Sequence, residues 1–106
     1  MFVINSEKKE RVLLPGVTIK PLASGDLTNL GEFRLQKGFR IPPHSHPYEQ
    51  TGYLVSGKLR FRIGNNWNET NPGDSWSIPL NTEHEVEILE DALVIEIFSP
   101  VRHDYL

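Results

Sequence analysis

The chain has 106 residues, of which 38% are hydrophobic and 24% are charged, which is typical of one globular domain spanning residues 1–106. Its net charge is only −3, so no nucleic-acid partner is expected, and the absence of cysteine excludes disulfides and thiolate ligands. The charged start, MFVINSEKKER, lacks the apolar core of a signal peptide, so we expect a cytoplasmic protein with no membrane partner.

The apolar residues alternate with polar ones in a series of short strands. In chain order, strands are predicted within residues 12–22 (between Pro15-Gly16 and Pro21), at 32–36, 51–55 and 58–63, from Trp67 onward, and at 75–78, 84–88 and 93–98. Turn signals occur at Ser24-Gly25-Asp26, Gly64-Asn65-Asn66, Pro72-Gly73-Asp74 and Glu90-Asp91. No stretch has apolar residues at helical spacing, so the sequence predicts an all-β barrel or sandwich.

Three potential metal ligands follow the predicted strand at 32–36. His44, His46 and Gln50 are separated by two and four residues, and in an extended chain such even spacings place side chains on one face. Pro42-Pro43 cannot donate to a sheet ladder, which puts these residues at a strand entrance or a sheet edge, where a site can remain open. Imidazole nitrogens suit zinc, nickel, copper and iron. A metal site that needs a further ligand is therefore predicted.

His84 is the predicted further ligand. It shares a face with Val86 and Ile88, which directs it inward, whereas Glu85 and Glu87 alternate outward. Gln50 either coordinates through its amide oxygen or only hydrogen-bonds a ligand histidine. Glu49 is an alternative carboxylate ligand, although its odd spacing directs it away unless a bulge shifts the register.

Donors without charge influence which reactions the metal can support. Three imidazoles and an amide leave a divalent ion its full charge, which favours anionic ligands and Lewis-acid chemistry over oxygen activation.

Glu96 is the candidate acid or base, because it is a carboxylate in a strand that is otherwise apolar on both faces. It is either paired with an arginine or held at a raised pKa for proton transfer, and Arg102 is the candidate partner in both cases. Arg102 would also suit a substrate carboxylate or could cap the barrel end. Tyr48 shares the spacing of the ligands, so it either lines the pocket or is a buried tyrosine with a satisfied hydroxyl. His103, in the tail, is expected to be exposed.

These spacings resemble those of the cupins. The first cupin motif is matched by Gly38, His44, His46, Gln50 and Gly57, with Gln50 in the place of a glutamate. The second is matched by Gly73, Pro79 and His84, with Asn81 in the place of a glycine and Ile88 in the place of an asparagine. The resemblance implies a double-stranded β-helix, the jelly-roll barrel of that family. It also implies a homodimer, in line with the need to cover sheet edges.

A closer resemblance is to the small cupins of pectin and alginate breakdown, which ketonise unsaturated monouronates. It rests on His44-Ser45-His46-Pro47, Gln50, Pro72-Gly73-Asp74 and the ending Phe98-Ser99-Pro100-Val101-Arg102-His103-Asp104. That family has a catalytic aspartate two residues before the phenylalanine, where this chain has Glu96. The resemblance implies one divalent ion, which could be nickel, zinc, iron or manganese, and a small anionic substrate. A sugar-acid binding protein without catalysis and a cupin dioxygenase are the alternatives.

Overall fold

The computed structural model describes all 106 residues and confirms the all-β prediction. The strands are β1 (Arg11–Leu14), β2 (Val17–Ser24), β3 (Asn29–Leu35), β4 (Arg40–His44), β5 (Glu49–Ile63), β6 (Asn66–Thr70), β7 (Ser75–Ile78) and β8 (His84–Ser99). The only helical elements are two single 3-10 turns, η1 (Asn5–Glu7) and η2 (His103–Tyr105). Neither could cross a membrane.

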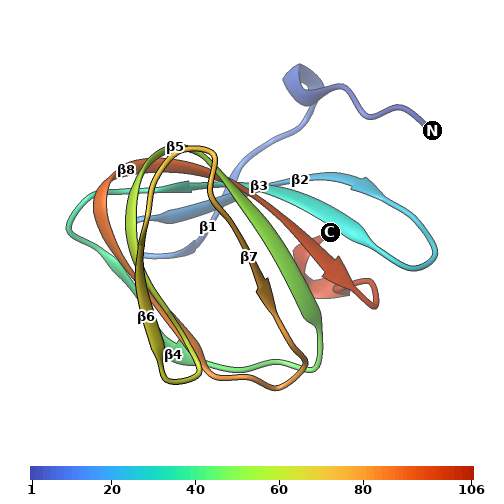
Figure 1. Cartoon of the computed structure of the whole chain (residues 1–106). Coiled ribbons are helices and arrows are strands. Elements are labelled where there is room, and N and C mark those ends of the chain that lie inside the picture. Colours follow the sequence, from blue (N-terminus) through green and yellow to red (C-terminus); the bar gives the residue numbers. More distant parts are fainter.

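All the strand pairs are antiparallel, and two long strands organise them. The main path runs β1-β2-β3-β8-β5-β6, while β4 also pairs with β8 and β7 also pairs with β5. Figure 1 shows β5 and β8 bending over so that the sheet wraps around one interior. The strand at 93–98 is central, as predicted, because this part of β8 has β3 on one side and β5 on the other.

The interior is filled by every second residue of the strands, as their alternation requires. On β8, for example, Val86, Ile88, Val94 and Phe98 are almost completely buried. Fourteen buried hydrophobic residues form one continuous core. The polar side chains that also face inward are therefore surrounded by apolar neighbours.

The predicted turn at Glu90-Asp91 is wrong, because β8 continues through it and joins the strands predicted at 84–88 and 93–98. Lys58 still pairs with Glu90, but the register of β5 against β8 shifts on both sides of Gly57. Gly57 has φ = +93° and lies against the Asp91 backbone, where a side chain would collide. The turn signal thus marks a bend with irregular pairing. The strands predicted at 51–55 and 58–63 likewise belong to one strand, β5.

The predicted strand end at Pro21 is also wrong, because β2 continues to Ser24. The pairing of β1 with β2 reaches only to Ile19, so Pro21 lies beyond the end of β1. On that side no neighbour needs the N–H group that proline lacks.

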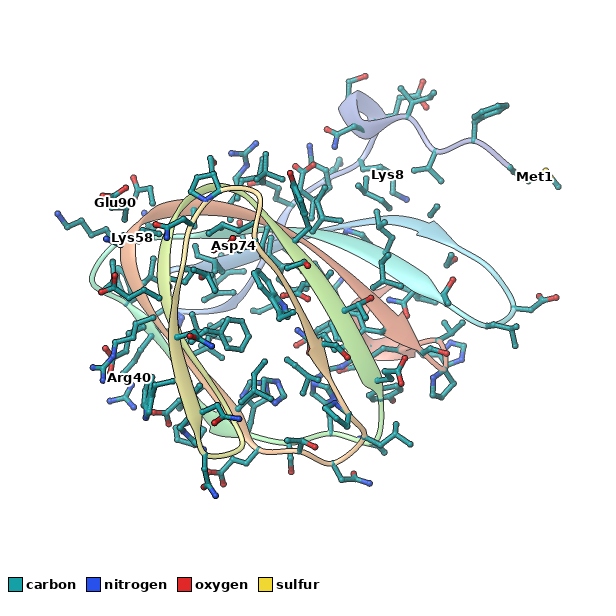
Figure 2. All side chains as sticks on the ribbon, in the orientation of Figure 1. Met1, Lys8, Arg40, Lys58, Asp74 and Glu90 are labelled. Carbon is teal, nitrogen blue, oxygen red and sulfur yellow. The ribbon has the colours of Figure 1, made fainter.

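The two ends of the chain are attached differently. Met1–Ile4 is exposed and extends away from the barrel (Figures 1 and 2), with η1 held by Asn5, which donates to Glu32 and accepts from Lys20. At the other end, Arg11 donates to the backbone carbonyls of Asp104 and Leu106. The C-terminal turn is thereby fastened to β1.

Candidate metal centre

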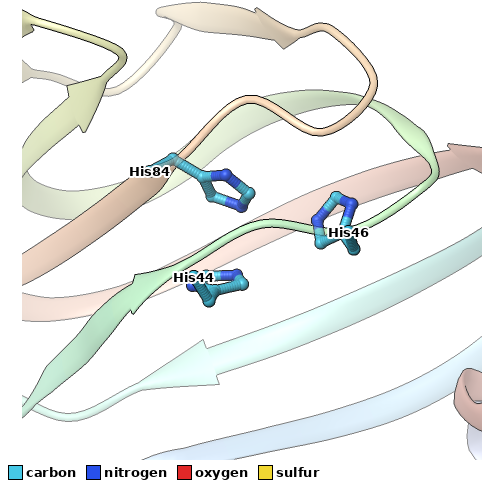
Figure 3. Close-up of side chains that lie close together, drawn as sticks. All are labelled: His44, His46 and His84. Atoms are coloured by element: carbon cyan, nitrogen blue, oxygen red, sulfur yellow. The ribbon is translucent and has the colours of Figure 1, made fainter.

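The three predicted histidine ligands come together in one cluster (Figure 3). His44 is the last residue of β4 and pairs directly with His84, the first residue of β8. His46 follows in the connection to β5. Their candidate ligand nitrogens all lie within 4.8 Å of one another, and His46 and His84 are buried. The cluster is therefore a candidate site for a divalent metal ion.

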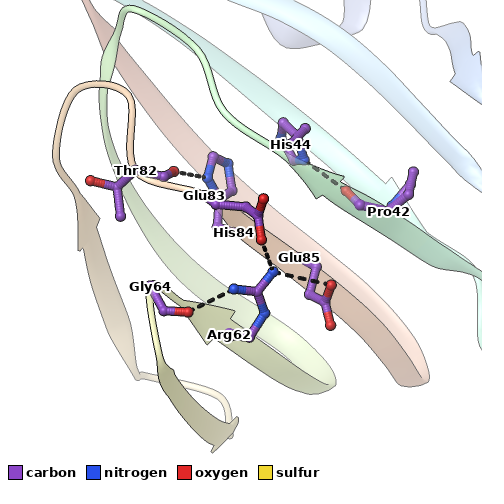
Figure 4. Close-up of polar contacts among 8 residues, drawn as sticks. All are labelled: Pro42, His44, Arg62, Gly64, Thr82, Glu83, His84 and Glu85. Carbon is purple, nitrogen blue, oxygen red and sulfur yellow. Dashed lines mark hydrogen bonds and ion pairs between the residues drawn. The ribbon is translucent and has the colours of Figure 1, made fainter.

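Each histidine ring is oriented by a backbone carbonyl two residues away, and Figure 4 shows two of these bonds. A carbonyl oxygen can only accept, so each Nδ1 carries the hydrogen and each Nε2 keeps a free lone pair. Such bonds are typical of metal-ligating histidines. The Nδ1–oxygen distances are 2.9 Å for His44 to Pro42, 3.1 Å for His46 to Tyr48 and 2.8 Å for His84 to Thr82.

Burial keeps two of the rings neutral. It lowers the pKa of His84 to about 4 and also lowers the pKa of His46, with Arg102 as the next largest cause for His46. The Nε2 atom of His84 is buried and has no hydrogen-bond partner in the protein. A buried, neutral nitrogen with an unused lone pair fits a metal ligand.

Gln50 faces the histidines from β5. Its side chain is buried, and its Oε1 lies 2.9 Å from Nε2 of His46. Both atoms are acceptors when the Nδ1 hydrogen of His46 is directed at Tyr48, so a cation between them would satisfy both. The Gln50 side chain also lies near Glu96 and acts to lower the pKa of its carboxyl group. Glu49 is exposed and faces away, as the even-odd spacing predicts, which excludes it as the alternative ligand.

Glu96 lies in the interior behind Gln50, with 6% of its surface exposed. The indole Nε1 of Trp76 donates to both of its carboxyl oxygens, at 3.2 Å each. Burial raises its pKa to about 8, although Gln50 and the hydrogen bond from Trp76 act in the opposite direction. Arg102 does not pair with it, so the arginine-pair alternative is wrong and Glu96 keeps its proton at neutral pH.

Arg102 stands over aromatic rings instead. Its guanidinium carbon lies 3.7 Å from the ring centre of Tyr105, 5.2 Å from that of Phe98 and 5.3 Å from that of Tyr48. Its backbone N–H donates to Asn29 and its Nε to Asp104, which leaves both terminal nitrogens without a protein partner. Arg102 is thus positioned to receive an anion.

A cavity of about 60 Å³ connects these groups. Its polar lining includes His44, His84, Gln50, Glu96 and Arg102, and most of the remaining lining is apolar. Its volume is on the order of two water molecules. Tyr48 does not line it and lies beside Arg102 and His46, while His103 is exposed in η2 as expected.

Glu85 departs from the prediction in one respect. It does face away from the barrel interior, yet only 9% of it is exposed, because Arg62 covers it. Arg62 binds Glu85 at 3.3 Å and Glu83 at 2.7 Å, and it also donates to the carbonyl of Gly64 (Figure 4). This cluster holds the start of β8, and thus His84, against β5.

Trp76 is the functional neighbour that sequence reasoning missed. The sequence places it within the strand predicted at 75–78 and gives it no role, whereas its indole N–H donates to both carboxyl oxygens of Glu96. A glycine inside the opposite strand, Gly52, is the sequence signal for such a close approach.

Comparisons with known proteins agree with this architecture. A family model described as a cupin domain, Cupin_2, matches residues 31–99. The structure of KdgF from Halomonas sp. shares 32% sequence identity with a TM-score of 0.93, covering 100% of this chain and 98% of that one. A search of the curated proteins gave no match.

Two other solved structures share the fold at lower identity. A cupin described as RmlC-like from Shewanella frigidimarina shares 21% identity with a TM-score of 0.93, covering 99% of this chain and 95% of that one. The polyketide cyclase RemF from Streptomyces resistomycificus shares 22% identity with a TM-score of 0.78, covering 94% and 78%. The predicted double-stranded β-helix barrel is confirmed.

Proposed function

Because the chain belongs to the cupin family, we propose that it is a metal-dependent enzyme that ketonises unsaturated monouronates. The observation that carries the proposal is Glu96, a buried carboxyl group with a pKa of about 8, beside three clustered histidines. The similarity to KdgF from Halomonas sp. supports it. So does the Phe98-Ser99-Pro100 tail, which resembles that of the uronate-ketonising cupins.

His44, His46 and His84 would hold one divalent ion, with Gln50 as the fourth protein ligand. Nickel, zinc and iron suit the imidazole donors, and manganese suits the amide oxygen of Gln50. When bound, the ion supplies Lewis-acid stabilisation of negative charge on a substrate oxygen. The neutral donors leave the ion its full charge, which favours an anionic substrate.

Arg102 would bind the uronate carboxylate through the two terminal nitrogens that have no protein partner. A guanidinium group suits this role because its planar fork matches a carboxylate with two parallel hydrogen bonds. The aromatic rings of Tyr48, Phe98 and Tyr105 restrict its orientation. Because the cavity holds only about two waters, the substrate would bind across its opening, with the enol directed toward Glu96.

Glu96 would supply the proton that ketonisation requires. The sugar ring first opens, because the bond between the hemiacetal carbon and the ring oxygen breaks while the hemiacetal hydroxyl proton passes to that oxygen, which gives an aldehyde and an enol. Ketonisation of the enol then moves one proton, because the enol O–H bond breaks while a C–H bond forms at the neighbouring carbon, with no net change in atoms or electrons. Glu96 is protonated at neutral pH, so it can protonate the carbon and then be restored by the enol proton. Tyr48, beside Arg102, is the second candidate proton carrier.

The test is the rate at which the absorbance of the carbon-carbon double bond disappears from an unsaturated galacturonate or guluronate. Ketonisation also occurs unaided, so the expected result is an acceleration that chelation abolishes. Glu96→Gln should lower kcat by at least about tenfold, as expected for lost acid catalysis. Arg102→Ala should mainly raise KM, whereas Arg40→Ala, which removes an exposed arginine outside the cavity, should change neither.

Three results would contradict the proposal in different ways. Substrate binding without acceleration would indicate a sugar-acid binding protein. Oxygen consumption with the loaded protein would indicate a dioxygenase. Full activity in Glu96→Gln together with none in His84→Ala would mean that Glu96 is not the proton carrier.

A further inference from the structure

Three neighbouring strands place Trp76, Gly52 and Glu96 in one row. Gly52 on β5 pairs with Trp76 on β7 and with Glu96 on β8. In an antiparallel sheet, directly paired residues project their side chains to the same face. Trp76 and Glu96 thus extend into the interior on either side of a residue that has no side chain.

The space above Gly52 is where the two side chains meet. A Cβ atom at this position would lie 2.2 Å from the indole Nε1 of Trp76 and 2.3 Å from Oε2 of Glu96. Such distances cannot occur in a folded protein, so the contact requires glycine here. Gly52 has no positive φ, so backbone conformation does not explain its presence. The close approach of the indole and the carboxyl group explains why this residue is a glycine.

The contact restrains the carboxyl group from one side. The indole N–H lies at the same distance, 3.2 Å, from each oxygen, so it donates along the axis of the carboxyl group rather than to one atom. The indole itself is held in place, because Trp76 is buried and its ring packs against the ring of Phe61, with 5.0 Å between the ring centres. Indole is a donor only and cannot exchange protons with the carboxyl group.

We infer that Trp76 is a positioning residue that fixes the orientation of the Glu96 carboxyl group, an inference that rests on the function proposed above. Gln50 contacts the carboxyl group on the side of the histidines, and Trp76 holds it from β7. Without the indole N–H, the carboxyl group can rotate about its terminal bond. Its proton is then less often directed at the substrate, although substrate binding is unaffected.

The sharpest test removes the hydrogen-bond donor and keeps the shape of the ring. The chain has two tryptophans, and Trp67 lies on the surface beside Arg60. In a Trp67→Phe background, biosynthetic replacement of tryptophan by 3-benzothienylalanine changes position 76 alone, exchanging the N–H for sulfur. We expect kcat to fall by about tenfold to a hundredfold, as for a misplaced catalytic group, with KM within about twofold of wild type.

Trp76→Phe should likewise lower kcat and leave KM nearly unchanged. Trp67→Phe alone should retain wild-type kinetics. The isosteric replacement keeps the test valid if Trp76→Phe does not fold. An unchanged kcat in the benzothienyl protein would overturn the positioning role while leaving the proposed function intact. A rise in KM equal to the fall in kcat would also overturn it. A wild-type protein without acceleration would overturn both proposals.

Discussion

His84 shows how the barrel prepares a ligand before any metal binds. Its Nδ1 hydrogen is committed to the carbonyl of Thr82, and its buried Nε2 has no partner. An unsatisfied buried nitrogen costs free energy in the folded protein. A metal ion would remove that cost, so metal binding should stabilise the fold as well as complete the site.

The first prediction concerns metal content. Purified wild-type protein should contain close to one divalent ion per chain by elemental analysis, and His84→Ala and His46→Ala should each lose most of it. Each change removes one donor from a small shell. His103→Ala is the matched control, because that histidine is exposed in the C-terminal turn and is not one of the three clustered histidines. Equal metal in wild type and His84→Ala would contradict the site.

The second prediction is the pH dependence of stability in the chelated protein. Burial raises the pKa of Glu96 in the native state to about 8, whereas the ordinary pKa of a glutamate is 4.5. Between these two pH values the native state therefore binds more protons than the unfolded state. The contribution of Glu96 to the stability of the wild type should therefore fall as pH rises through this range, by up to about 1.4 kcal/mol per pH unit. Glu96→Gln cannot ionise and should lose none of this stability.

The measurement is the difference in unfolding free energy between Glu96→Gln and wild type, from denaturant titrations at a series of pH values. The difference should grow in favour of the variant up to about pH 8 and then level off. His84 and His46, whose pKa values are lowered, act in the opposite direction below about pH 6.5, but both are present in both proteins and their effects cancel. A difference that does not change with pH would contradict a protonated native Glu96.

The sequence predicts the histidine cluster well because even spacing along an extended chain decides which face a side chain occupies. The partners of Glu96 could not be predicted in this way. Trp76 and Glu96 meet only because β7 and β8 lie on either side of β5 in one particular register. That register depends on pairing between residues far apart in the sequence.

The strand β5 contains a stretch with irregular pairing and one position at which only glycine fits. The register shifts around Gly57 absorb the bend of the sheet, and Gly52 admits the Trp76–Glu96 contact. From the sequence alone, each long strand is predicted as two shorter strands, divided at a glycine or at an acidic pair. These residues are also common in turns, so the pattern does not distinguish a bend from a turn. Only the continuous pairing of β5 with β8 shows that these are bends within strands.

The third prediction tests the space above Gly52. Gly52→Ala should destabilise the protein by about 1–3 kcal/mol or more, because the added methyl group overlaps the indole and the carboxyl group. Gly25→Ala is the matched control, since its added Cβ would meet nothing closer than 4.0 Å, and its effect should stay within about 0.5 kcal/mol. Chemical denaturation of both variants provides the measurement. Equal stabilities would show that the barrel accommodates the methyl group and that the contact is not tightly held.

The outer face of the barrel carries exposed apolar side chains where β5 and β8 pair. Tyr53, Val55 and Ile97 are 48%, 40% and 39% exposed, and Ile95 lies directly opposite Tyr53. Contiguous apolar surface of this kind commonly marks a protein contact. It is the surface that we expect to be covered in the predicted homodimer.

The fourth prediction is therefore a dimer that this face holds together. Light scattering in the micromolar range should give the mass of two chains, and Ile97→Asp should give the mass of one, because it buries a charge in the interface. Leu27→Asp is the control, since Leu27 is 76% exposed in the turn between β2 and β3. A wild-type protein that is monomeric across this range would reject the prediction.

The central place of β8 also has a consequence for protein synthesis. β3, β4 and β5 all pair with β8, yet each of them leaves the ribosome before it does. Until residues 84–99 emerge, these strands have unpaired edges and the barrel cannot close, which exposes the nascent chain to aggregation. Closure of the barrel must therefore wait for β8, so slow translation of the first eighty residues should bring no benefit.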